Sequence, residues 1–162
     1  MEKILKRVYA SRGTKTALSV LSYISVALSV IAFAFAFGYK IYLGRYTETA
    51  ILCACALIGF IAVTLARKLI NAPRPYELYS FYEVKPKSKK GSSFPSRHAY
   101  SAFVIATLSI ALSPYLAIAL YIFAFVLIVC RVLLGIHFVR DVLAGALLGV
   151  ISGAVGLLIT QI

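Results

Sequence analysis

Acidic residues and histidines are scarce in this sequence, and the few that occur are not scattered. Only five of the 162 residues are Asp or Glu, against 17 Lys or Arg, and the chain holds two histidines and one aspartate. These three side chains, His98, His137 and Asp141, all lie next to the ends of apolar segments. Because histidine and carboxylate groups commonly carry proton transfers in proteins, their shared placement makes them the first candidates for chemistry.

Long polar stretches are also lacking, which excludes an ordinary soluble domain. Hydrophobic side chains make up 62% of the chain and the mean hydropathy is +0.94, whereas soluble domains are about half apolar. A bilayer core about 30 Å thick requires roughly 20 mainly apolar residues per helix, and five such stretches occupy most of the sequence. We therefore predict an all-α integral membrane protein, with residues 1–162 forming a single membrane-embedded domain built as a bundle of five transmembrane helices.

Cysteine is too sparse and too dispersed for a disulfide framework. Cys53 and Cys55 are two positions apart in one apolar segment, so they point to different helix faces, and Cys130 lies in another segment. We interpret all three as small buried hydrophobic residues and not as a disulfide or a metal site.

The formal net charge of +12 would suggest nucleic acid as a partner in a soluble protein. Here the basic residues lie at the boundaries of apolar segments and no nucleic-acid-binding motif accompanies them, so we expect no DNA or RNA partner. Anionic headgroups of the bilayer, or a phosphorylated lipid substrate, are the partners that this charge predicts.

The apolar segments and their flanking residues predict where the helices lie. We expect them over about residues 17–38, 49–69, 95–112, 114–134 and 138 to near the C-terminus. The second should end at Ala72-Pro73-Arg74-Pro75, because proline lacks the helical N–H donor. Ser93 or a neighbour should cap the third, with Pro95 in its first turn. Glycines in the fifth are spaced for close helix packing, at Gly145, Gly149, Gly153 and Gly156.

The order of the crossings predicts which helix ends meet. The end of the second helix, the start of the third and the junction of the fourth and fifth should emerge on the side of the N-terminus. Fifteen of the 17 Lys and Arg residues lie on that side, against Lys40 and Arg45 on the other, and the positive-inside rule makes that side cytoplasmic. We expect a multi-pass protein of the cell membrane with its polar clusters at the cytoplasmic face.

Three polar clusters should meet at that face. They consist of Arg67 and Arg74, of Ser96, Arg97 and His98, and of Arg131, His137 and Asp141. The four guanidinium groups present planar forks that match phosphate oxygens. Free N–H groups at the start of the third helix add the positive end of a helix dipole. The combination predicts a site for a bound phosphate group.

The two histidines and the aspartate suggest how such a phosphate could react. His137 and Asp141 are four residues apart at the start of the fifth helix, so they lie on one face within reach of each other. Asp141 can accept a hydrogen bond from one ring nitrogen, leaving the other free to attack phosphorus. His98, from another helix, could protonate the departing alkoxide. These residues could also form a metal site, but the arginines would repel a cation, so we expect neither metal nor cofactor.

At these residues the sequence closely resembles the type 2 phosphatidic acid phosphatase (PAP2) superfamily, the membrane relatives of bacterial acid phosphatases and vanadium haloperoxidases. The superfamily has a three-part signature: Lys-x6-Arg-Pro, Pro-Ser-Gly-His and Ser-Arg-x5-His-x3-Asp. The match spans residues 67–141 and reads Arg67-x6-Arg74-Pro75, Pro95-Ser96-Arg97-His98 and Cys130-Arg131-x5-His137-x3-Asp141. Arg67 thus replaces lysine, Arg97 replaces glycine and Cys130 replaces serine.

The resemblance implies a PAP2-like helical core and metal-independent hydrolysis of a phosphate ester through a phosphohistidine. It implies that His137 is the nucleophile, that Asp141 orients it and that His98 is the general acid. It also implies that the phosphate is held by Arg67, Arg74, Ser96 and Arg131, with Arg97 either adding a contact or facing the headgroup. Well-known membrane members are similar to six-helix proteins with outward-facing sites, unlike the five helices and cytoplasmic site expected here.

We therefore expect an integral membrane lipid phosphatase that removes a terminal phosphate from a membrane lipid. Polyprenyl diphosphate, phosphatidylglycerol phosphate and phosphatidic acid are the candidate substrates, and the sequence does not choose among them. The alternative is a non-catalytic membrane protein that binds or transports lipid headgroups through the same pocket.

Overall fold

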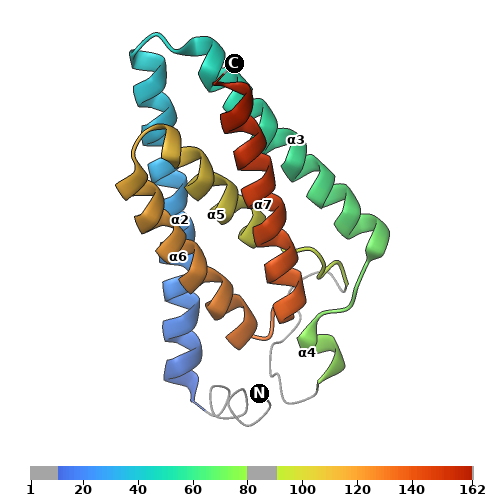
Figure 1. Cartoon of the computed structure of the whole chain (residues 1–162). Helices are drawn as coiled ribbons and strands as arrows, with labels where there is room; N and C mark the ends of the chain where they lie inside the picture. Colours follow the sequence, from blue (N-terminus) through green and yellow to red (C-terminus); the bar gives the residue numbers. More distant parts are fainter. Residues whose placement is uncertain (1–10, 80–90, 162) are drawn as a thin grey trace.

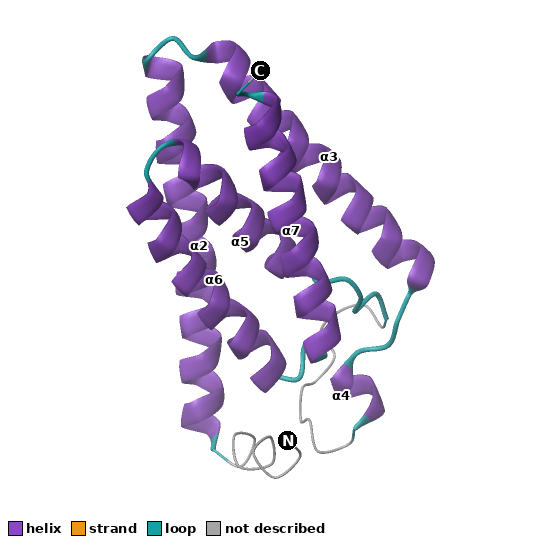
Figure 2. Cartoon of the chain, viewed as in Figure 1, coloured by secondary structure: helices purple, strands orange, loops and turns teal. Residues whose placement is uncertain are grey.

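The computed structural model describes residues 11–79 and 91–161, and every regular element in those ranges is a helix (Figures 1 and 2). The elements are α2 (Arg12–Tyr42), α3 (Tyr46–Ile70), α4 (Pro75–Leu78), α5 (Arg97–Leu108), the 3₁₀ turn η1 (Ser109–Ala111), α6 (Pro114–Leu133) and α7 (Val139–Ile159). The predicted all-α class is confirmed, and the five predicted helices correspond to α2, α3, α5, α6 and α7.

Helix α5 differs from the other four in length and in position. Within the described ranges, α2, α3, α6 and α7 are long and apolar enough to cross a membrane. Helix α5 has 12 residues, which at 1.5 Å per residue cover about 18 Å, less than a bilayer core. It lies inside the bundle and packs against α7, α6, α3 and α2 (Figure 1). The first residues of α5 are therefore surrounded by the other helices.

The structure corrects the predicted start of α5. The helix begins at Arg97, and Ser96 is its N-cap, with the hydroxyl accepting a hydrogen bond from the Ala99 N–H at 3.4 Å. Pro95 follows a cis peptide bond and precedes the helix instead of lying in its first turn. The cause that ends α3 also differs from the prediction. The helix ends at Ile70, where Asn71 adopts a left-handed conformation, φ 44°, ahead of Pro73 and Pro75.

Helices α5 and α7 approach so closely that their backbones touch. A Cβ atom at Gly149 would lie 2.5 Å from the carbonyl oxygen of Tyr100 and 2.9 Å from the Val104 nitrogen. A Cβ atom at Gly145 would collide with the Ser96 carbonyl oxygen. The predicted packing role of these glycines is thus confirmed, and it brings the starts of α5 and α7 together.

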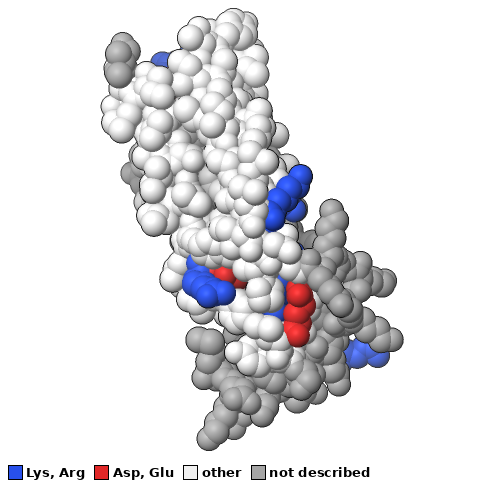
Figure 3. Space-filling model, turned by 90° about the vertical axis from the view of Figure 1, so that its right-hand side faces the viewer, with Lys and Arg blue, Asp and Glu red and all other residues white. Residues whose placement is uncertain are grey.

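The charged side chains gather at one end of the bundle. Figure 1 places the end of α3, the start of α5 and the α6–α7 turn toward the end of the bundle where α2 begins, as the order of crossings predicts. The space-filling view shows most of the opposite half without charge (Figure 3). At that opposite end, Glu48 pairs with both Lys40 and Arg45. The basic charge there is partly neutralised by a carboxylate.

We predict that Gly149→Ala destabilises the protein and lowers its activity. The added methyl group meets backbone atoms of α5, which cannot move aside without separating α5 from α7, and overpacking of this kind costs about 1–3 kcal/mol. Thermal unfolding in detergent would measure the loss. Gly38→Ala is the matched control, because nothing lies within 4 Å of a Cβ atom at that position in α2. Equal melting temperatures for the two variants would contradict the close contact.

Candidate active site

Three side chains form a buried network where α5, α6 and α7 meet. His137 lies in the turn between α6 and α7 and is 2% exposed, while Ser93 and Asp141 are fully buried. The Ser93 hydroxyl donates to Asp141 Oδ2 at 2.5 Å and lies 3.3 Å from His137 Nδ1. His137 Nδ1 and Asp141 Oδ2 are 3.6 Å apart, and the Phe138 N–H donates to the same oxygen at 3.0 Å. The carboxylate therefore accepts two hydrogen bonds beside the imidazole.

This network determines which nitrogen of His137 is free. The one hydroxyl proton of Ser93 points to Asp141, so a hydrogen bond between Ser93 Oγ and His137 Nδ1 requires the proton on Nδ1. The lone pair of the neutral ring then lies on Nε2. Burial lowers the pKa of His137, with Asp141 opposing and Arg74 reinforcing the effect. The ring is therefore uncharged at neutral pH and suited to nucleophilic attack.

The sequence alone did not identify Ser93 as part of the site. The sequence predicts only that Ser93 could cap the third helix, because its partners in the network are 44 and 48 residues away in the chain. The one signal available was its position two residues before Pro95. The segment is anchored by the Ser93 N–H, which donates to the Ala72 carbonyl at 2.8 Å.

Three of the predicted arginines surround this end of the bundle. Arg67 on α3 is 6% exposed and donates from Nη1 to the Pro95 carbonyl at 3.0 Å. Arg74 donates from Nε to the Gly91 carbonyl at 3.2 Å. The Nε of Arg131 on α6 is buried without a hydrogen-bond partner. None of the three pairs with a carboxylate in the described part of the chain, so their positive charges are available to an anion.

Ser96 and Arg97 are placed differently from each other. Ser96 is fully buried, its hydroxyl caps α5, and its N–H donates to the Asp141 carbonyl oxygen at 2.9 Å. It therefore joins the start of α5 to the start of α7. Arg97 is exposed and points toward α3, with its guanidinium carbon 5.9 Å from the centre of the Phe60 ring.

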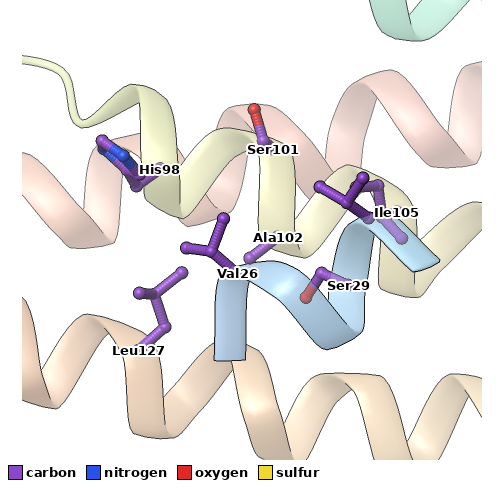
Figure 4. A pocket seen from close by; sticks show the side chains of 8 residues that line it. Val26, Ser29, His98, Ser101, Ala102, Ile105 and Leu127 are labelled. Carbon is purple, nitrogen blue, oxygen red and sulfur yellow. The ribbon is translucent and has the colours of Figure 1, made fainter. Parts of the chain in front are cut away.

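His98 faces a pocket between α2, α5 and α6. Figure 4 shows Val26 and Ser29 from α2, Ile105 from α5 and Leu127 from α6 around a cavity of about 40 Å³, with His98 at one end. The His98 side chain is exposed at the mouth of this pocket. It is the one ionisable side chain in an otherwise largely apolar lining.

The protein around His98 favours the neutral form of its ring. Desolvation by the surrounding protein, and then the charge of Arg131, lower the pKa of His98 to about 3. A bound phosphate carries the opposite charge and offsets the arginines, so its arrival favours protonation of His98. The same group can thus be neutral before binding and an acid after it.

The described residues contain no group of three or more His, Cys, Asp and Glu side chains arranged to hold a metal ion. The site is instead lined by guanidinium groups, two imidazoles and hydroxyls, a set of donors suited to phosphate oxygens.

Comparisons with known proteins show the family to which the chain belongs. The model of the PAP2 superfamily matches residues 48–161, so the chain belongs to that superfamily. A curated relative, Lipid A 1-phosphatase from Porphyromonas gingivalis, is 30% identical over 130 residues, which is 78% of this chain. The match covers 27% of the relative, so this chain spans about a quarter of that protein's length.

Solved structures of two membrane proteins have a similar fold. A transmembrane PAP2-type phosphatidylglycerolphosphate phosphatase from Bacillus subtilis matches with a TM-score of 0.70 and 21% identity, over 99% of this chain and 84% of that chain. LpxE from Aquifex aeolicus matches with a TM-score of 0.66 and 23% identity, over 96% and 93% of the two chains. Such likenesses establish the shared helical architecture.

We predict that Ser93→Ala lowers the catalytic rate by about 10- to 100-fold, because a hydrogen bond to a charged group is worth about 1.5–3 kcal/mol. Without the hydroxyl, the carboxylate of Asp141 keeps only the Phe138 N–H of its two hydrogen bonds, and His137 Nδ1 loses its partner Ser93 Oγ. Initial rates of phosphate release would measure the effect. Ser92→Ala is the control, because that hydroxyl contacts only Asn71 among the described residues, at the exposed surface. Equal rates for the two variants would exclude a role for Ser93.

Proposed function

We propose that the protein is a metal-independent lipid phosphate phosphatase that works through a phosphohistidine on His137. The observation that carries the proposal is the free Nε2 lone pair of a buried, neutral His137 beside arginines that pair with no carboxylate among residues 11–79 and 91–161. A phosphate held by those arginines would supply the missing negative charge. Family membership supports the same reaction class.

The proposed reaction has two steps. His137 Nε2 attacks phosphorus, the bond from phosphorus to the leaving oxygen breaks, and protonated His98 transfers its proton to that oxygen. A water molecule then attacks the phosphohistidine, His98 accepts a proton from the water, and His137 is released with inorganic phosphate. Arg67, Arg74 and Arg131 stabilise the charge on the equatorial oxygens in both steps. Ser96 supports the site by holding the start of α5.

The leaving group is proposed to be the lipid part of the substrate. Its oxygen must lie beside His98 to receive the proton, and the pocket next to His98 is mostly apolar and lies between helices of the bundle. The carbon atoms nearest the leaving oxygen can lie against this apolar lining, while the rest of the hydrocarbon chain stays in the bilayer. Polyprenyl diphosphate, phosphatidylglycerol phosphate and phosphatidic acid each combine a terminal phosphate with such a chain.

We also propose that the site faces the cytoplasm. The proposal rests on the excess of Lys and Arg in the segments at the end of the bundle that holds the site.

Substitutions of the two histidines should differ in how their loss of activity depends on the leaving group of the substrate. Purified protein in detergent should release phosphate from the three lipids with EDTA present, and vanadate should inhibit it. We expect His137→Ala to lose at least about 1,000-fold on every substrate, because no other group forms the covalent intermediate. His98→Gln should lose about 100-fold or more on lipids but much less on p-nitrophenyl phosphate, whose leaving group needs no proton. Unchanged turnover in His137→Ala, or equal losses of His98→Gln on both kinds of substrate, would contradict these roles.

Orientation can be tested by cysteine labelling in intact cells. Leu78→Cys and Tyr42→Cys introduce thiols at exposed positions near opposite ends of the bundle, 57% and 84% exposed respectively. A cytoplasmic site predicts that an impermeant reagent labels Tyr42→Cys from outside and leaves Leu78→Cys unlabelled. The reverse pattern would place the site outside the cell.

A further inference from the structure

Arg97 lies apart from the arginines around His137. It is the first residue of α5, its side chain is exposed, and its guanidinium carbon lies 5.9 Å from the centre of the Phe60 ring on α3. His98, the next residue, points about 100° away around the helix, toward the pocket lined by α2 and α6. The start of α5 thus presents a cation and the proposed general acid on neighbouring faces.

The position of Arg97 is electrostatically unfavourable without an anion. The first turn of a helix has the positive end of the helix dipole, which disfavours a cation, and the first turn of α5 holds no acidic residue. Arg97 is also close enough to Arg67 and His98 for its charge to act on both. No carboxylate in the described part of the chain pairs with it. An anion bound here would remove the conflict.

The Phe60 ring beneath Arg97 is held in place by Tyr100. The Phe60 ring packs against Tyr100, with ring centres 6.3 Å apart. The Tyr100 hydroxyl donates to the Ala56 carbonyl on α3 at 2.8 Å, and Tyr100 is 1% exposed. An arginine held over an aromatic ring keeps its N–H donors at the edge of the plane, free for oxygen atoms. The guanidinium is therefore positioned before any ligand arrives.

We propose that Arg97, held over Phe60, forms a second anion subsite that binds a negatively charged group on the leaving side of the substrate. This inference rests on the proposed function and narrows its substrate class. The preferred substrates are lipids whose leaving group carries its own anionic phosphate, such as the inner phosphate of a diphosphate or a phosphodiester. A phosphatidic acid, whose leaving group is a neutral diacylglycerol, lacks a partner for Arg97.

The position of the subsite follows from the reaction geometry. His137 attacks the terminal phosphorus, and the leaving oxygen lies on the side of His98. Arg97 precedes His98 on the same helix turn, so a charged group one bond beyond the leaving oxygen comes within reach of Arg97. The arginine would then also stabilise the negative charge that develops on the leaving oxygen.

Farnesyl diphosphate and farnesyl monophosphate test the proposal, since they share one hydrocarbon chain and differ in the charge of the leaving group. We expect Arg97→Gln to lower kcat/KM for the diphosphate by about 10- to 100-fold more than for the monophosphate, the range of a hydrogen bond to a charged group. Arg97→Lys should keep part of the preference. Lys68→Gln is the matched control. It removes one exposed positive charge near the end of α3, on the same side of the bundle as Arg97, and should affect both substrates equally.

Equal losses on the two substrates in Arg97→Gln, or a preference for the diphosphate that survives this change, would overturn the proposal. Binding of an alkyl methylenediphosphonate and an alkylphosphonate, neither of which is hydrolysed, separates the subsite from catalysis. If wild-type protein cleaves neither farnesyl ester, the proposed function fails. The subsite is still supported if the diphosphonate binds more tightly and Arg97→Gln abolishes that difference, and it is refuted if the two ligands bind alike.

Discussion

The carboxylate of Asp141 is fully enclosed by protein, and a buried charge of this kind is tolerated only when polar partners surround it. The partners of Oδ2 come from separate parts of the chain: the segment before α5 supplies Ser93, and the α6–α7 turn supplies His137 and the Phe138 N–H. Arg140 Nε lies 3.5 Å from the other oxygen, Oδ1. The Asp141 backbone carbonyl also accepts the Ser96 N–H. Burying the one aspartate therefore ties the starts of α5 and α7 to each other and fixes the position of the His137 ring at the same time.

The arginines of the site differ from Asp141, because no carboxylate in the described part of the chain pairs with them. At the other end of the bundle, Glu48 compensates Lys40 and Arg45, whereas Arg67, Arg74, Arg97 and Arg131 have no such partner among the described residues. Guanidinium groups held by backbone carbonyls, as Arg67 and Arg74 are, repel one another until an anion arrives. A phosphate group placed among these guanidinium groups, as we propose, would relieve their mutual repulsion and stabilise the negative charge of the transition state.

Much of this arrangement could be predicted from the sequence, since apolar length and the order of crossings determine which helix ends meet. The five helices and the common location of the three polar clusters follow from those features. The start of α5 could not be predicted, because both Ser93 and Ser96 suit a cap and only packing against α7 distinguishes them. The role of Ser93 depends on contacts 44 and 48 residues away, and the direction of Arg97 depends on Phe60 of α3. Such pairings are set by tertiary packing, which local patterns do not report.

A structure of the protein with bound vanadate would test the central claim most directly, because vanadate adopts the five-coordinate geometry of phosphorus during transfer. We predict a vanadium atom bonded to His137 Nε2, with His98 on the opposite side. The equatorial oxygens should lie among Arg67, Arg74 and Arg131, and Ser93 should still donate its hydrogen bond to Asp141. Vanadate bound through a metal ion, or held away from His137 with its Nε2 donating a hydrogen bond elsewhere, would contradict it.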